Sequence, residues 1–292
     1  MPLFTVAFLF LDMNKMIFNG RTINADTLII GADNRGLRYG DGIFETMKMI
    51  KGRVILPELH IERLFTGLKL LGFDIGPHFS PSGLEEQMNQ LCFKNNCTKQ
   101  ARIRLMVFRG NGGLYDPENN KVNYVIQAWP LNDSILTINE NGLEIDIYQD
   151  ARKSCDLFSN LKSANFLPYI MASFFAKSNK LNDCLVLNQF GRIADATLAN
   201  IFIIRDRQIM TPPLSEGCVA GVMRKHIIQQ MALKGNAIHE HIITPQDIAN
   251  AEEVFLTNAI YGIRWVKQCG RTRFTGAATK ELYLQIISPL IC

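Results

Sequence analysis

The sequence lacks the marks of a membrane protein and of a nucleic-acid-binding protein. No apolar run approaches the roughly 18 residues that a transmembrane helix needs, and Lys and Arg form no dense block. The formal net charge of +4 is small enough for the binding of small anions to account for it. We therefore expect neither a membrane nor a nucleic acid as a partner.

The cysteines lack the spacing of a metal site or of a disulfide framework. No CxxC or Cys/His pattern joins the seven of them, which are Cys92, Cys97, Cys155, Cys184, Cys218, Cys269 and Cys292. An odd, scattered set favours a reducing compartment, hence a cytoplasmic location, and argues against zinc. No metal ligand is predicted.

The N-terminus is apolar from Met1 to Leu11 but lacks a basic segment and an A-x-A-like cleavage site. A signal peptide is one interpretation of this stretch. We favour the other, in which Met13 or Met16 is the natural start and residues 1–15 are an upstream extension.

Internal repeats and low-complexity segments are also absent, while 47% apolar and 20% charged residues can build a substantial core. A polar, turn-rich stretch at 130–141 divides the chain into two domains, 16–130 and 142–292. Apolar spacing predicts helices at 59–71, 81–95, 166–180 and 222–234. Strands are predicted at 43–50, 53–56, 102–108, 122–129, 143–149, 184–188, 200–205 and 253–257. These elements mix without a regular βαβ period, so the predicted fold class is α+β.

Lys162 is the most informative residue, because it has no charged neighbour between Asp156 and Lys177. It lies in a short turn before an apolar helix, which suggests that the amine is partly enclosed. A desolvated lysine has a lowered pKa and can attack an aldehyde to form a Schiff base. A lysine stem packed on an apolar surface would give the same pattern.

Three further features agree with Lys162, although each has an ordinary explanation. Asp195 is flanked by small apolar residues and needs a partner to stay charged, such as the protonated pyridine nitrogen of pyridoxal phosphate; a turn aspartate is the alternative. Gly221 precedes a helix whose N-terminus could bind an anion, as many glycine loops do. Arg63 could clamp a phosphate or simply face solvent.

Seven segments in sequence order resemble the fold-type IV pyridoxal-phosphate enzymes, which include branched-chain and D-amino-acid aminotransferases and aminodeoxychorismate lyases. The resemblance covers about residues 16–270. The segments are Arg38–Thr46, His60–Leu64, Leu161–Pro168, Asp195–Phe202, Met210–Leu214, Ala220–Arg224 and Glu253–Ala259. Their order is far more specific than any one of them.

The resemblance implies roles for individual residues. Lys162 is similar to the Schiff-base lysine of the family. Phosphate ligands are implied at Arg63, Gly221, Val222, Met223, Asn258 and Ala259. Asp195 stands where most of the family has glutamate, so the backbone or the cofactor must shift to close a gap of one methylene. The resemblance also implies a two-domain fold like that of D-amino-acid aminotransferase, and a homodimer.

The substrate residues are less clearly indicated. Arg104 aligns approximately with an arginine that binds the substrate carboxylate in branched-chain enzymes, although an arginine on the wet face of a strand would look the same. Arg109 opens a loop, Arg109–Gly113, that resembles the lyases, and Tyr39 belongs to the first of the seven segments. We expect these three residues to bind a small-molecule amine substrate.

The segment Asn258–Ile263 also resembles the lyases. The expected reaction is therefore conversion of 4-amino-4-deoxychorismate to 4-aminobenzoate and pyruvate, a step toward folate. The alternative is a class IV aminotransferase that acts on branched-chain or D-amino acids with a 2-oxo acid as acceptor. A third interpretation, suggested by Asp195, is a cofactor-binding protein without efficient catalysis.

Overall fold

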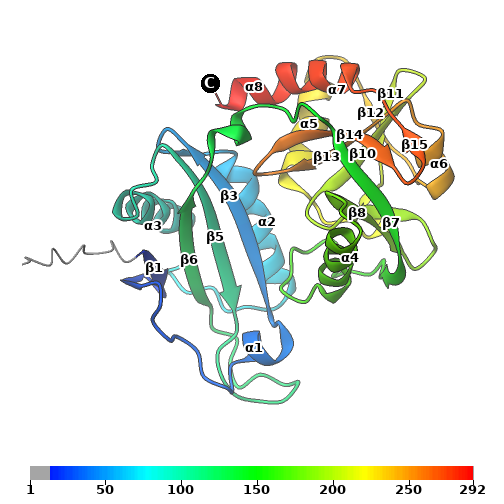
Figure 1. Cartoon of the computed structure of the whole chain (residues 1–292). Helices are drawn as coiled ribbons and strands as arrows, with labels where there is room; N and C mark the ends of the chain where they lie inside the picture. Colours follow the sequence, from blue (N-terminus) through cyan, green and yellow to red (C-terminus); the bar gives the residue numbers. More distant parts are fainter. Residues whose placement is uncertain (1–13, 292) are drawn as a thin grey trace, which may run out of the picture.

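Two β-sheets covered by helices form the molecule (Figure 1). The structure is a computed structural model and describes residues 14–291. The first sheet has the strand order β2-β1-β6-β5-β3-β4. Its strands are β1 (Lys15–Phe18), β2 (Arg21–Asn24), β3 (Gly42–Ile50), β4 (Arg53–Val54), β5 (Gln100–Phe108) and β6 (Asn123–Pro130). All of them precede the polar stretch at 130–141. The two-domain division stays a prediction that this arrangement favours.

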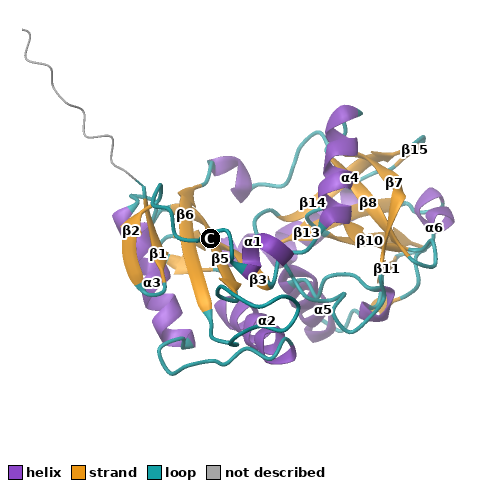
Figure 2. Ribbon diagram, turned by 90° about the horizontal axis from the view of Figure 1, so that it is seen from below, coloured by secondary structure: helices purple, strands orange, loops and turns teal. Residues whose placement is uncertain are grey.

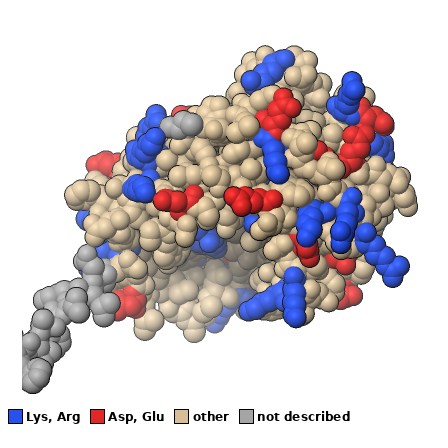
Figure 3. Space-filling model, turned by 45° about the horizontal axis from the view of Figure 1, so that its top comes forward, with Lys and Arg blue, Asp and Glu red and all other residues tan. Residues whose placement is uncertain are grey.

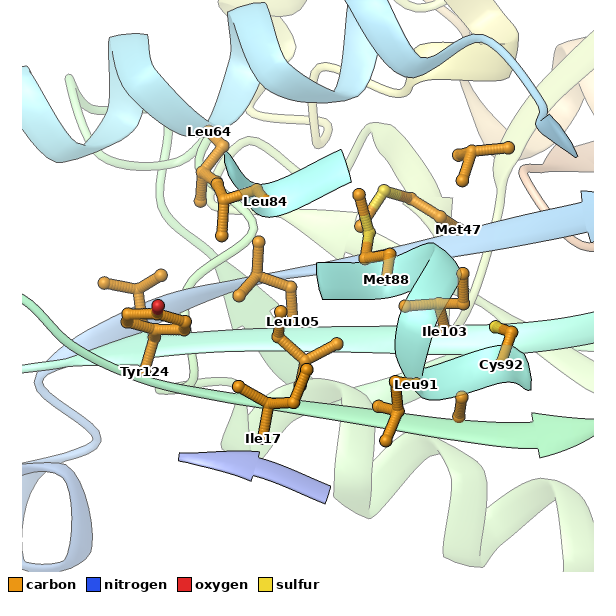
Figure 4. Packing of buried hydrophobic residues seen from close by; sticks show 14 of the residues in the cluster. Ile17, Met47, Leu64, Leu84, Met88, Leu91, Cys92, Ile103, Leu105 and Tyr124 are labelled. Carbon is orange, nitrogen blue, oxygen red and sulfur yellow. The ribbon is translucent and has the colours of Figure 1, made fainter. Parts of the chain in front are cut away.

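The first sheet is stabilised by two helices on one of its faces. These are α2 (Pro57–Leu70) and α3 (Pro81–Lys94), and a short helix α1 (Arg35–Tyr39) precedes β3. Leu64 of α2 and Met88 of α3 pack on Met47 and Ile103 of the central strands (Figure 4). Every second residue of β3 and β5 therefore points into this core, and the residues between them point toward the second sheet.

The second sheet has the order β12-β11-β10-β13-β14-β7-β8-β9, with β15 paired to β14. Its strands are β7 (Leu143–Lys153), β8 (Asp183–Asn188), β9 (Ile193–Ala196), β10 (Asn200–Arg205), β11 (Gln208–Thr211), β12 (Ile238–Glu240), β13 (Glu253–Asn258), β14 (Gly262–Cys269) and β15 (Thr272–Arg273). β7 runs parallel to β8 and β14, whereas β13 is antiparallel to β10 and β14.

Helices cover the second sheet on both sides (Figure 2). They are α4 (Leu167–Ser178), α5 (Val222–Leu233), α6 (Pro245–Ala249), α7 (Ala277–Leu282) and α8 (Ser288–Ile291), with a π-helical turn at Tyr283–Ile287 and 3₁₀ turns at Asp133–Leu136 and Leu214–Glu216. Tyr169 and Ala172 of α4 pack on Val186 of β8. Ile50 of β3 joins a cluster with Phe255 and so connects the two sheets.

The predicted helices all exist, with ends that differ by a few residues. Two of the predicted strands, β3 and β4, pair as a hairpin. Lys51 and Gly52 between them have positive φ angles of 49° and 75°, the backbone that a tight two-residue β-turn requires. The predicted strand 53–56 is only two residues long. The strands that were not predicted are β1, β2, β9, β11, β12, β14 and β15.

The predicted extension at 1–15 lies outside the described residues except for its last two. Lys15 begins β1, and its backbone N–H donates to Asn95 Oδ1 at 2.8 Å. Within residues 14–291 no helix is long and apolar enough to cross a bilayer, and the six cysteines that the structure describes are free thiols.

Candidate active site

A cavity of about 560 Å³ lies between the two sheets. Its walls come from β3, β5 and α2 on one side and from α4, β9, the start of α5 and the end of β13 on the other. Nine residues predicted for the site line it together, namely Arg63, Arg104, Lys162, Asp195, Gly221, Val222, Met223, Asn258 and Ala259. Residues far apart in sequence thus face one space.

Lys162 lies in the loop between β7 and α4, and the backbone of this loop is fixed against β3. Phe44 N–H donates to Lys162 O at 2.9 Å, and Ala164 N–H donates to Gly42 O at 2.9 Å. The Lys162 Nζ lies 4.6 Å from the centre of the Phe44 ring. Burial, aided by the nearby Arg63 cation, lowers the pKa of Lys162 to about 8, so part of this amine is neutral and nucleophilic near neutral pH.

Arg63 on α2 lines the cavity, but the edge of its guanidinium that carries Nε and Nη2 faces Glu45 of β3. Its Nε and Nη2 donate to the two Glu45 oxygens at 2.8 and 2.5 Å, and Nη1 donates to Ala220 O at 3.0 Å. Burial alone would raise the pKa of Glu45, but Arg63 and His60 lower it to about 2. One N–H bond of Nη1 and one of Nη2 remain free for a phosphate, so the phosphate role of Arg63 stays a prediction.

The N-terminus of α5 offers backbone donors to the cavity. The first N–H groups of a helix have no intrahelical acceptor, and no side chain caps this helix at Gly221. A Cβ at Gly221 would lie 1.8 Å from Asn200 Oδ1, so a larger residue there would displace the Asn200 side chain. Val222 and Met223 can therefore present N–H groups and the positive end of the helix dipole to an anion.

Asp195 is central in the short strand β9 and is buried, so it is not a turn aspartate. The Tyr169 hydroxyl donates to its two oxygens, at 2.8 and 2.9 Å, and Val219 N–H donates to Oδ2 at 2.9 Å. Lys153 donates to the Tyr169 oxygen at 2.7 Å and lies 3.6 Å from Asp195 Oδ2. This buried lysine and Tyr169 were not predicted from the sequence, since only the fold brings β7, α4 and β9 together.

The turn after β13 forms another wall. Asn258 Oδ1 accepts hydrogen bonds from the N–H groups of Ile260 at 3.0 Å and Tyr261 at 2.9 Å, which fixes the turn. Thr257 also lines the cavity, and its buried hydroxyl has no hydrogen-bond partner among the described residues. Because a buried hydroxyl without a partner is costly, Thr257 marks a place for a polar ligand atom. No pattern in the sequence indicated this hydroxyl.

Arg104 and Arg102 point from β5 into the cavity. The Arg104 guanidinium lies 4.0 Å from the centre of the Phe44 ring. Burial and the neighbouring Arg102 cation lower the pKa of Arg104. Neither guanidinium forms a hydrogen bond or ion pair with another of residues 14–291, so both are available to an anion.

Two predictions for the substrate site are wrong for the cavity of this chain. Arg109 is bound outside the cavity. Its Nε lies 3.2 Å from Asp41 Oδ1, its Nη1 donates to Asn120 Oδ1 at 2.7 Å, and its guanidinium lies 4.2 Å from the centre of the Phe73 ring. Tyr39 lies on α1, with its ring 5.8 Å from that of Tyr115. Both lie at the end of the first sheet where β3 begins and β5 ends, and neither lines the cavity.

The cavity fits pyridoxal phosphate in its chemistry. It contains an amine with a lowered pKa, a buried carboxylate, an uncapped helix N-terminus and an unpartnered hydroxyl. These groups match the aldehyde, the pyridine nitrogen and the phosphate of that cofactor. Among residues 14–291 no three His, Cys, Asp or Glu side chains are grouped as a metal site would require.

The surface charge is mixed. On the face shown in Figure 3, basic and acidic side chains are interspersed and form no extended basic patch.

Comparison with known proteins identifies the family. The pattern of amino-transferase class IV matches residues 42–269. The chain is similar to a putative branched-chain-amino-acid aminotransferase of Methanocaldococcus jannaschii (28% identity, 83% of each chain) and to an aminodeoxychorismate lyase of Vibrio harveyi (25% identity, 79% of this chain and 83% of the relative).

A solved structure has the same fold. It is a hypothetical aminotransferase from Mycobacterium tuberculosis in its pyridoxal-phosphate-bound form, which matches with a TM-score of 0.82 at 15% identity over 95% of this chain and 98% of the other. The expected α+β, D-amino-acid-aminotransferase-like fold is thereby confirmed. The chain belongs to the class IV aminotransferase family and is a pyridoxal-phosphate-dependent enzyme of fold type IV.

Proposed function

We propose that the protein is a lyase that converts 4-amino-4-deoxychorismate to 4-aminobenzoate and pyruvate. The observation that carries this proposal is the position of the Asn258–Tyr261 turn. This segment resembles the lyases in sequence, and the turn lines the same cavity as Lys162. The second lyase-like segment, Arg109–Gly113, does not line the cavity and adds no support.

The chain's own groups have separate roles in the proposed reaction. Lys162 would hold the cofactor through its amine, and the freed amine would remove the proton next to the substrate nitrogen. Asp195 would serve the pyridine nitrogen, and Arg104 would bind a substrate carboxylate. Arg63, the start of α5, and Asn258 with Ala259 would hold the phosphate. The bound cofactor supplies an electron sink.

An aminotransferase is the alternative, and one feature of the cavity favours it. Ile170 and Phe174 of α4 and Leu198 line one side of the cavity, where an aliphatic amino-acid side chain would fit. Both reactions need the same proton removal by Lys162. They differ in the later steps, so the products decide between them.

A product assay tests the lyase proposal. The holoenzyme is expected to release 4-aminobenzoate and pyruvate continuously from 4-amino-4-deoxychorismate without any 2-oxo acid, because a lyase regenerates the aldehyde cofactor in each cycle. D-alanine, leucine and glutamate are the comparison substrates. Rapid bleaching of the visible band by one of these, rescued by a 2-oxo acid and without 4-aminobenzoate formation, would instead establish the aminotransferase.

The phosphate role of Arg63 is open to a binding measurement. Arg63→Ala is expected to weaken pyridoxal-phosphate binding by roughly ten- to a hundredfold, since a charge-assisted contact contributes about 1.5–3 kcal/mol. Dissociation constants would be measured on the apoprotein by titration. An unchanged constant would place the arginine outside the phosphate site.

The Arg63 variant also leaves the buried Glu45 carboxylate with His60 as its remaining partner. Thermal unfolding of the apoprotein should therefore be recorded beside the titration. Arg53→Ala is the matched control, because Arg53 is exposed on β4, outside the cavity.

A homodimer in the cytoplasm is a further proposal, supported by the family resemblance and the cysteine usage.

A further inference from the structure

Arg102 is a cavity residue with no role in the reaction described above. It lies on β5, two residues before Arg104, so both side chains leave the same face of the strand. Two residues of a strand span about 6.6 Å, which places the two guanidinium groups near enough to act on one small ligand. Both residues line the cavity.

The strand pairing concentrates positive charge at this point. Lys48 of β3 is paired directly with Arg102, and Thr46 with Arg104. Lys48 is 1% exposed, and its amine, like the two guanidinium groups, has no hydrogen bond or ion pair with another of residues 14–291. The nearest acidic residue of β3, Glu45, points to the opposite face and is bound to Arg63. On this face, β3 and β5 therefore contribute three cations and no acidic side chain.

A single carboxylate does not use this arrangement fully. Arg104 is half-buried beside Phe44 and next to Lys162 in the cavity wall. Arg102 is exposed and lies two residues nearer the start of β5. A ligand with one carboxylate at Arg104 leaves Arg102 without a partner. A ligand with a second carboxylate would reach both.

We propose that Arg102 and Arg104 together bind an amine substrate with two carboxylates, and that Arg102 selects for the second one. The inference rests on the proposed function and deepens it. The two products of that reaction, 4-aminobenzoate and pyruvate, each contain one carboxylate, so the substrate contains both.

Two unreactive ligands of similar length, glutarate and butyrate, test the proposal on the holoenzyme. Their affinities would be measured by competition against substrate or by perturbation of the visible band. The wild-type protein is expected to bind the dicarboxylate at least about tenfold more tightly, because an additional charge-assisted contact contributes that much.

Arg102→Met keeps the aliphatic stem and removes the cation. It is expected to weaken glutarate binding by about tenfold and to leave butyrate binding within about twofold, whereas Arg104→Met should weaken both. Arg53→Met controls for the loss of a surface charge. An unchanged ratio of the two affinities in Arg102→Met, or an equal loss for both ligands, would overturn the proposal.

The product assay tests the lyase proposal, the affinity ratio tests the role of Arg102, and either proposal can be refuted without the other. If no 4-aminobenzoate forms but Arg102→Met still removes the preference for glutarate, the substrate is a different dicarboxylate amine and the inference stands. If 4-aminobenzoate forms and the ratio does not change, the lyase stands and Arg102 has no part in its selectivity.

Discussion

Lys162→Ala is expected to abolish measurable turnover. The loss of proton transfer alone lowers catalysis by roughly 10²–10⁴-fold, and the variant also loses the amine that attaches the cofactor. Initial rates of pyruvate release would measure the effect. Lys162→Arg is the matched variant, because it keeps a cation in the cavity but provides no nucleophile, and it should be equally inactive.

Chemical mapping distinguishes Lys162 from the other enclosed lysines. Borohydride reduction of the holoenzyme followed by peptide analysis should place the pyridoxyl group on Lys162. Lys48 also has a pKa lowered to about 8 by burial, and Lys153 is buried beside Tyr169. Of the three only Lys162 lines the cavity, so label on either of the others would refute the assignment.

The pKa of Lys162 gives this prediction a pH dependence. The neutral amine is the nucleophile, and its pKa falls from 10.5 to about 8. About a tenth of the amine is then neutral at pH 7, compared with well below 1% for an unperturbed lysine. The rate at which apoprotein attaches the cofactor should rise with pH and level off above about pH 8. A rise that continues to pH 10 would mean that the amine is solvated.

The sequence predicted those elements in which local pattern and fold agree. Apolar residues at helical spacing placed α2, and Pro168 marks the first turn of α4, which begins at Leu167. β9 was missed because it has only four residues, with Asp195 among them. In β14, the pairing register shifts between Val266 and Gln268, and a strand with such an irregularity shows no clean alternation.

For the site, too, the sequence identified residues that belong to local motifs and missed contacts that depend on the fold. Residues within ordered motifs, such as Lys162 and Gly221, were found from the sequence and do line the cavity. Tyr39 and Arg109 came from the same kind of motif but lie where β3 begins and β5 ends, outside the cavity lining. Lys153 was missed because its contact with Asp195 depends on the packing of β7 against β8 and β9. A motif identifies residue types, whereas only tertiary structure determines which side chains meet.

Asp195→Asn is expected to lower turnover by roughly 10²-fold or more, the range found when one preorganised group that stabilises charge in the transition state is removed. A neutral amide cannot balance a protonated pyridine nitrogen, so the cofactor would bind but would accept electrons poorly. Turnover and cofactor content would be measured on the same preparation. Near-normal turnover with full cofactor content would show that the carboxylate does not act on the cofactor.

The partners of Asp195 complicate this variant and define its control. Removing the carboxylate leaves the buried Lys153 ammonium with only the Tyr169 hydroxyl, and an uncompensated buried charge is destabilising. Asp195→Glu keeps the charge and restores the reach that most of the family has, so its turnover should stay near that of the wild type.

The double variant Asp195→Asn, Lys153→Met removes both charges. It should recover the thermal stability lost in Asp195→Asn but not the turnover, which separates the structural role of this ion pair from the role of Asp195 in catalysis. Recovery of turnover in the double variant would show that Asp195 serves only to neutralise Lys153.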